Sequence, residues 1–223
     1  MHARSIIGWG ALAAGIATIA GWSAAAAWRP SREHFALQGV DVSDAAGAID
    51  WHEVKADGAD FAYVRATSGA DRRDARFASN WADVEEAGLR RGAIHHFSLC
   101  RLASDQASNF LRTVPRDAAA LPAAVELTLD PDCAPPAREV VVQEVARLVA
   151  AIETHTGKPA LLKVDRGFER AYTITAAIAR PIWSSQLAFP PDYAARPWRM
   201  WQANPARHVN GAEQPIGWDV VAP

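Results

Sequence analysis

Residues 120–133 read ALPAAVELTLDPDC. Within this stretch Val125 and Leu127 alternate with Glu126 and Thr128, which is the period of a β-strand. The alternation puts Glu126 and Thr128 on one face of the strand. A strand that is otherwise apolar therefore presents a carboxylate and, two residues later, a hydroxyl on the same side of its sheet.

Strand-like and helix-like runs alternate on both sides of this stretch. Because no Gly-rich phosphate fingerprint accompanies the alternation, it predicts an α/β barrel or an open parallel sheet. The helices between the later strands are weaker, which argues against a regular eightfold barrel. We expect strands at 37–43, 61–67, 92–98, 123–129, 160–165, 181–186 and 198–204, and helices at 51–58, 74–89, 104–111 and 138–157.

The composition indicates one sizeable domain. The chain has 223 residues and a formal net charge of −2, so no basic excess indicates a nucleic-acid partner. Three of the nine tryptophans lie before residue 31, which leaves six in the predicted domain. An exposed Trp can stack on a sugar ring, but most Trp side chains in a domain of this size belong to the core.

The first thirty residues differ in kind from the rest. A short basic start (MHARS) precedes a long apolar run without charge. This pattern predicts a secretory signal with a cleavage region around Ser23 to Ala27. The run is also long enough to span a bilayer, so an uncleaved anchor is the alternative. Either way we expect an exported domain, periplasmic or extracellular, which an uncleaved segment would hold at the inner membrane.

The only two cysteines, Cys100 and Cys133, each follow a strand-like run. In an exported protein such a pair favours a disulfide, and two unrelated thiols are the alternative. His95 and His96 are adjacent on one strand and so point to opposite faces, which makes a shared metal ion difficult. We expect His95 to lie in the core or line the groove and His96 to face outward. With no other metal-ligand spacing in the sequence, we expect no metal and no cofactor.

Eight short motifs of the sequence occur together, in one order and at ordinary spacings. As a set they resemble glycoside hydrolase family 25, the Chalaropsis-type lysozymes or N-acetylmuramidases. The resemblance extends from residue 37 to the C-terminus, and we expect the domain to span 36–223. The motifs are GVDVS (39–43), GAIDW (47–51), FAYVRATSG (61–69), FASNW (77–81), AGLRRGAIHHF (87–97), QASNF (106–110), LPAAVEL (121–127) and WQ (201–202).

The resemblance implies an irregular, TIM-like α/β barrel that cleaves the glycan strand of peptidoglycan after N-acetylmuramic acid. It also implies an acidic site, with an Asp on the first strand, an Asp-x-Glu pair on the fourth and an Asp near the end of the chain. The Glu donates the proton to the leaving oxygen, and the Asp of the pair steadies the substrate's acetamido group. Such an acid must hold a proton near neutral pH, which calls for a buried carboxyl.

The acidic residues match unevenly. Asp41 matches the first-strand Asp, for which the alternative is a loop cap or an ion pair with Arg65. Asp219 matches the Asp near the end of the chain. On the fourth strand Glu126 takes the Asp position, and Thr128 takes the position of the proton donor. Threonine cannot act as a general acid at any useful pH.

The substrate-binding positions also match in part. His95, Trp201 and Gln202 match family residues, while Ser68 stands where the family has an acidic residue. The resemblance thus implies that these four residues bind substrate. Scaffold motifs persist while groove residues change, and the further changes are at Ala46, Ile94, Ala203 and Val221.

Two functions follow from this pattern. The first is a peptidoglycan hydrolase with weakened or lost activity, in which Asp41, Glu126 and Asp219 form the acidic cluster. Glu126 is a poor substitute acid because it lies about 6.6 to 7 Å along the strand from the lost position. The second is a non-catalytic protein that binds peptidoglycan or a partner at the envelope. For both we expect a monomer whose ligand is the glycan strand.

Overall fold

The computed structural model describes residues 26–223. Residues 1–25 of the predicted leader lie outside the described residues. They include the first part of the predicted cleavage region, which runs from Ser23 to Ala27. Within residues 26–223 no helix is long and apolar enough to cross a membrane.

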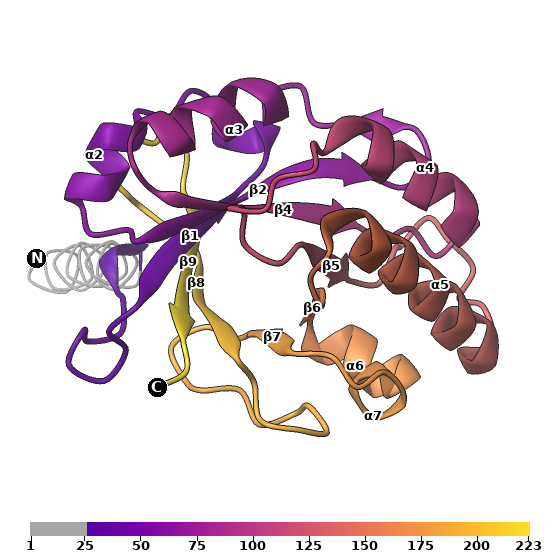
Figure 1. Cartoon of the computed structure of the whole chain (residues 1–223). Coiled ribbons are helices and arrows are strands. Elements are labelled where there is room, and N and C mark those ends of the chain that lie inside the picture. The colour runs from indigo at the N-terminus through magenta and orange to yellow at the C-terminus, as the bar shows by residue number, and fades with distance from the viewer. Residues whose placement is uncertain (1–25) are drawn as a thin grey trace, which may run out of the picture.

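The strands form one closed barrel, and Figure 1 shows them as a ring around the middle of the view. Within the ring, neighbouring strands are parallel except at β9 (Ile216–Val221), which runs antiparallel to both β8 (Met200–Arg207) and β1 (Gln38–Val42). The pairing of β1 with β2 closes the ring, and β3 (Arg72–Arg73) only extends the end of β2. The order around the barrel is β1 (Gln38–Val42), β9 (Ile216–Val221), β8 (Met200–Arg207), β7 (Ile182–Ser185), β6 (Leu161–Val164), β5 (Ala124–Leu127), β4 (Arg90–His96) and β2 (Phe61–Ser68).

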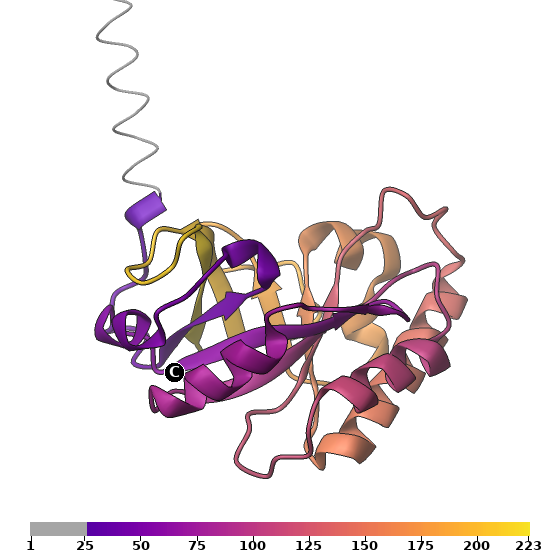
Figure 2. The same cartoon turned by 90° about the horizontal axis from the view of Figure 1, so that it is seen from above.

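The helices cover this barrel unevenly, which confirms the predicted irregular, TIM-like architecture. Figures 1 and 2 show α3, α4 and α5 on the outside of the first half of the ring. The second half has only short helices after β6, and no described helix lies between β7 and β9. The helices are η1 (Asp44–Ala46), α2 (Trp51–Ala56), α3 (Phe77–Glu86), α4 (Ala103–Thr113), α5 (Arg138–Thr156), α6 (Arg166–Tyr172) and α7 (Ile174–Ala177).

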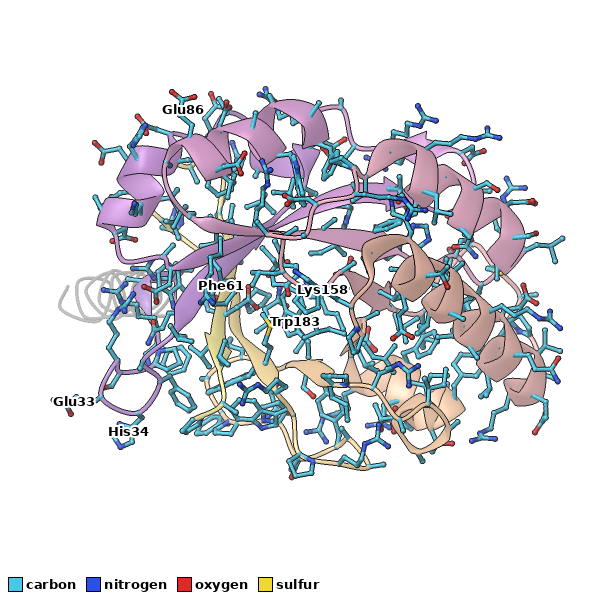
Figure 3. The ribbon with its side chains drawn as sticks, in the orientation of Figure 1. Glu33, His34, Phe61, Glu86, Lys158 and Trp183 are labelled. Atoms are coloured by element: carbon cyan, nitrogen blue, oxygen red, sulfur yellow. A yellow bond between two sulfur atoms is a disulfide. The ribbon has the colours of Figure 1, made fainter. Side chains whose placement is uncertain are left out.

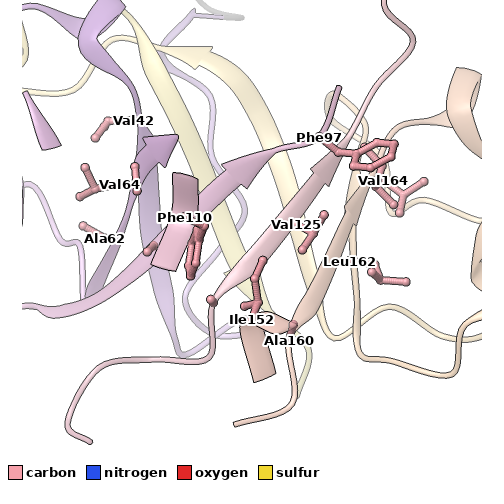
Figure 4. Close-up of a cluster of buried hydrophobic side chains, with 14 of the residues drawn as sticks. Val42, Ala62, Val64, Phe97, Phe110, Val125, Ile152, Ala160, Leu162 and Val164 are labelled. Atoms are coloured by element: carbon pink, nitrogen blue, oxygen red, sulfur yellow. The ribbon is translucent and has the colours of Figure 1, made fainter. Parts of the chain in front are cut away.

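The larger core lies between the strands and their helices. Val125 of β5 packs outward there with Phe110 of α4 and Ile152 of α5, and all three are fully buried (Figure 4). Burying one such side chain contributes about 1.5 to 3 kcal/mol, so this face fixes the register of β5. With Val125 and Leu127 outward, Glu126 between them must point into the barrel.

A smaller core fills the barrel near the start of its parallel strands. Phe61, Tyr63, Ile94 and Trp183 belong to it, and Figure 3 shows Phe61 and Trp183 within the ring of strands. Trp183 and Tyr63 pack with ring centroids 4.9 Å apart. This apolar layer leaves polar side chains to the other end of the barrel, where the parallel strands finish.

The segment before β1 packs on the barrel. The rings of Trp28 and Phe35 lie 6.3 Å and 5.9 Å from that of Trp201, and Arg29 lies over Trp218. Residues that precede the first family motif, which begins at Gly39, therefore already pack against β8 and β9.

Candidate active site

Four of the predicted site residues meet inside the barrel, at the end where the parallel strands finish. Asp41 comes from β1, Glu126 from β5, Gln202 from β8 and Asp219 from β9. Since β1 and β9 are neighbours with Gly39 opposite Asp219, the first and last of these strands bring two carboxylates close together. In parallel α/β barrels this end carries the chemistry.

Lys163 of β6 joins these carboxylates, although sequence reasoning missed it. Its ammonium nitrogen lies 2.6 Å from Asp41 Oδ2 and 3.1 Å from Glu126 Oε1, and its side chain is 5% exposed. Burial lowers the pKa of Lys163, but Asp41 and Glu126 outweigh burial and raise it above its ordinary value. Lys163 is therefore a permanent cation at the centre of the cluster.

Glu126 is held as a carboxylate. Its Oε2 lies 2.5 Å from Arg65 Nη2 and 3.1 Å from His96 Nδ1, while Oε1 faces Lys163. Burial alone would raise the pKa of Glu126, but Lys163, His96 and Arg65 together bring it well below its usual range. Glu126 thus carries no proton to donate near neutral pH.

Both oxygens of Asp41 are also engaged. Oδ2 accepts from Lys163, and Oδ1 accepts from Gln202 Nε2 at 2.5 Å. The other end of the Gln202 amide accepts from Ser185 Oγ at 2.6 Å, which fixes its orientation. Gly217 faces this pair across the sheet, and a methyl group there would fall 1.9 Å from Asp41 Oδ1. The strand pairing thus leaves room for the carboxylate only because residue 217 is glycine.

The pKa of Asp219 is shifted in the opposite direction to that of Glu126. It is fully buried, its Oδ1 accepts from Trp183 Nε1 at 2.9 Å, and its Oδ2 has no partner. Burial, and then the charge of Asp41, raise the pKa of Asp219 well above its usual range. Asp219 can retain a proton but has no exposed surface through which to pass it to a glycan.

Thr128 lies just after β5, which ends at Leu127 and is shorter than the strand expected at 123–129. Leu129 accordingly is half-exposed in the loop. The position that the family resemblance assigns to the proton donor thus holds a partly buried hydroxyl beside the loop and no carboxyl.

A hollow with a volume of about 290 Å³ opens beside this cluster. Ser68 and His96 line it, together with Ser98 and Arg101 from the loop after β4 and Pro131 from the loop after β5. The Cys100–Cys133 disulfide joins these two loops, as predicted. The bridge therefore ties two walls of the hollow together. The role of Ser68 in substrate binding stays a prediction.

Two predicted groove residues lie elsewhere. His95 is fully buried on the helix side of β4, where its ring contacts Thr67 Oγ1 at 2.7 Å and Gln106 Oε1 at 3.1 Å. Burial lowers the pKa of His95 to about 4, so the ring is neutral. The expectation that His96 faces outward is wrong, because strand alternation turns His96, and not His95, toward Glu126.

Trp201 is also buried. Its ring packs with Trp28, Phe35 and Trp198, and its Nε1 donates to the carbonyl of Gln186 at 2.7 Å. We expected Trp201 in the groove, but its neighbour Gln202 takes that place since adjacent strand residues face opposite sides. Direct binding of a sugar by His95 or Trp201 is not favoured by these positions.

A signal for Lys163 is present in the sequence. Its strand, ALLKVD, carries one charge in an apolar run just as AAVELTL does. In the sheet Glu126 and Lys163 are register partners on neighbouring strands. Arg65, considered as a partner of Asp41, pairs instead with Glu126.

Comparison with known proteins shows which family this barrel belongs to. The family model for glycosyl hydrolases family 25 matches residues 40–212. The chain belongs to glycosyl hydrolases family 25. A family 25 glycosyl hydrolase structure from Bacillus anthracis is 30% identical to this family 25 protein, with a TM-score of 0.79, and the match covers 87% of this chain and 92% of that one.

Three other proteins match this chain to different extents. The Escherichia coli K12 protein "Uncharacterized protein YegX" is 29% identical over 192 residues, which cover 83% of this chain and 70% of the relative. Lysozyme M1 of Streptomyces globisporus is 46% identical over 59 residues, 26% of this chain and 20% of the lysozyme. A bacterial lysozyme structure from Streptomyces coelicolor shares the fold, with a TM-score of 0.75 at 24% identity over 83% of this chain and 91% of that one.

Proposed function

We propose that this family 25 protein binds the glycan strand of peptidoglycan in the cell envelope and that its muramidase activity is weakened or lost. One observation carries the second part of the proposal. Glu126, the acidic residue nearest the lost donor position on its strand, is ion-paired with Arg65 and Lys163, and its Oε2 also contacts His96 Nδ1 at 3.1 Å. Family membership and the lysozyme named among its relatives support the choice of ligand.

The proton inventory of the cluster supports loss of catalysis. Glycoside cleavage needs a carboxylic acid that holds a proton and touches the leaving oxygen. Glu126 is ionised, Asp41 already accepts two hydrogen bonds, and Asp219 is sealed from the surface. Thr128 has no acidic proton to give. No single residue of the cluster therefore both holds a proton near neutral pH and reaches the leaving oxygen.

The charge balance also differs from that of an acidic site. Lys163 and Arg65 offset the negative charges of Asp41 and Glu126, and Asp219 favours its neutral form. A cluster with balanced charge can hydrogen-bond to the hydroxyl and acetamido groups of an uncleaved glycan. It has no excess negative charge with which to stabilise the positive charge that develops on the sugar during cleavage. The hollow lined by Ser68 and His96 offers adjoining space for such a ligand.

Export is part of the proposal. The Cys100–Cys133 bridge is a feature of proteins that mature in oxidising compartments, in agreement with the predicted leader. We propose the leader either as a cleaved signal or as an anchor at the inner membrane. N-terminal sequencing of the mature protein separates them, because a start near residue 28 indicates cleavage and a start at residue 1 indicates an anchor.

Co-sedimentation with purified sacculi tests the proposed binding. We expect the protein to pellet with sacculi in a saturable manner and free glycan oligosaccharides to displace it. A Gln202→Ala variant, which removes the amide that contacts Asp41, should pellet less, while an Arg112→Ala variant on the outer helix α4 should behave like the wild type. Absence of saturable binding by the wild type would overturn the proposal.

A further inference from the structure

The loop after β7 exposes two large apolar side chains at the end of the barrel that holds the site. Phe189 is 72% exposed and Leu187 is 49% exposed. Among the described residues, Phe189 is the most exposed large hydrophobic side chain. So much exposed aromatic surface adds little to folding stability and is typical of binding surfaces.

The backbone between these two side chains is strained. Ala188 has φ 67, and the N–H of Phe189 donates to the carbonyl of Leu187 at 2.9 Å, which makes a γ-turn. A non-glycine residue in this region costs on the order of 1–3 kcal/mol, so neighbouring bonds must hold it. The Ala188 N–H donates to the Ala203 carbonyl at 3.0 Å, and Gln186 Nε2 donates to the Phe189 carbonyl at 3.1 Å.

This turn is continuous with the acidic cluster. The N–H of Gln186 donates to the carbonyl of Gln202, whose side chain contacts Asp41. On its other side Arg166 donates to Gln186 Oε1 at 2.6 Å and pairs with the exposed carboxylate of Asp192 at 2.9 Å. The apolar turn is thus joined to the strand that carries Gln202, and polar groups of Gln186, Arg166 and Asp192 flank it.

We propose that Phe189, with Leu187, forms a preformed platform on which one pyranose ring of the glycan stacks outside the acidic cluster. The proposal rests on the glycan-binding function above and names a contact for it. A pyranose ring presents an apolar C–H face with hydroxyl groups at its edge, which matches an aromatic ring flanked by polar side chains. The strained turn keeps the platform in place before the glycan arrives, so little ordering entropy is lost on binding.

Calorimetric titration with a peptide-free GlcNAc–MurNAc tetrasaccharide tests the platform. We expect Phe189→Ala to weaken binding on the order of fivefold to tenfold, and Phe189→Trp to bind as well as the wild type or better. Val140→Ala, which truncates an apolar side chain 51% exposed on α5, is the matched control and should not change affinity. Thermal melts show whether each variant is folded.

Three results would overturn the platform, and they are distinguishable. If the wild type binds the tetrasaccharide and Phe189→Ala binds within twofold of it, the platform is wrong while the proposed function stands. If the wild type does not bind the tetrasaccharide, the platform and the proposed function both fail. If sedimentation shows a wild-type dimer that Phe189→Ala dissociates, the surface is a contact between copies of this chain.

Discussion

At the scale of single residues, the cluster is organised around a buried cation. Lys163 lies between Asp41 and Glu126, and the stability of each carboxylate depends on it. Buried ion pairs add little net stability, but removing one partner is costly because it strands the other charge. The fold therefore depends on the ion pairs of the cluster, which also form a candidate ligand-binding site.

Replacing Lys163 by methionine tests this view of the network. We expect Lys163→Met to lower the free energy of unfolding by about 3–5 kcal/mol, because Asp41 and Glu126 lose their shared counter-charge. Urea denaturation measures the change. Arg101→Met, which removes an exposed cation without an ion pair among the described residues, should stay within about 0.5 kcal/mol. A loss below about 1 kcal/mol in Lys163→Met would show that the carboxylates do not need it.

Asp219 gives a prediction about pH. Its folded pKa is raised above the unfolded one, so its contribution to stability is complete below pH 3.8 and is lost as the pH rises toward the folded pKa. Asn at this position mimics the protonated acid. We expect the stability of the wild type relative to Asp219→Asn to fall above pH 4 by up to about 1.4 kcal/mol per pH unit. A difference independent of pH between 4 and 8 would contradict the raised pKa.

At the scale of elements, His95 links β4 to α4. Its folded pKa of about 4 lies below the ordinary 6.5, so this link is stable above pH 6.5 and weakens as the pH falls toward 4. The loss should reach about 3 kcal/mol at pH 4. Titration of the ring carbon signals of His95 by NMR measures it directly, and a midpoint near 6.5 would show that the ring is accessible.

The disulfide acts on two loops. It closes a sequence separation of 33 residues, for which the chain-entropy model gives about 4 kcal/mol. We expect Cys100→Ala with Cys133→Ala to lower the free energy of unfolding by about this amount and also to weaken glycan binding, because the walls of the hollow are no longer joined. Unfolding and co-sedimentation measure the two effects. Unchanged glycan binding would limit the bridge to a role in stability.

Most elements could be predicted because their patterns are local. The alternation in AAVELTL and the apolar face of the helix at 138–157, with Gly157 after its end, gave elements at nearly the right places. The sequence pattern predicts the end of β5 two residues too late, because Leu129 continues the alternation although no neighbouring strand pairs with it. The face of the His95–His96 pair could not be read, since both faces of β4 are buried.

At the scale of the whole molecule, the barrel and its acidic residues were predictable while the counter-charges were not. The resemblance located Asp41, Glu126 and Asp219 through motifs that carry their own spacing. Lys163 contacts Asp41 across 122 positions of sequence, and only the closed barrel brings the two together. Because only the closed barrel brings Lys163 to Asp41, the single charge in the strand ALLKVD does not identify Lys163 as a partner of Asp41.

The central claim is that this family 25 barrel no longer holds a working general acid. Incubation of the purified protein with sacculi, followed by quantification of new reducing ends at N-acetylmuramic acid, tests it most directly. We predict that release from pH 4 to pH 8 stays close to that of heat-inactivated protein and does not change in Glu126→Gln, under conditions where the protein co-sediments with sacculi. Release of reducing ends that disappears in Glu126→Gln would contradict the claim and return Glu126 to the role of acid.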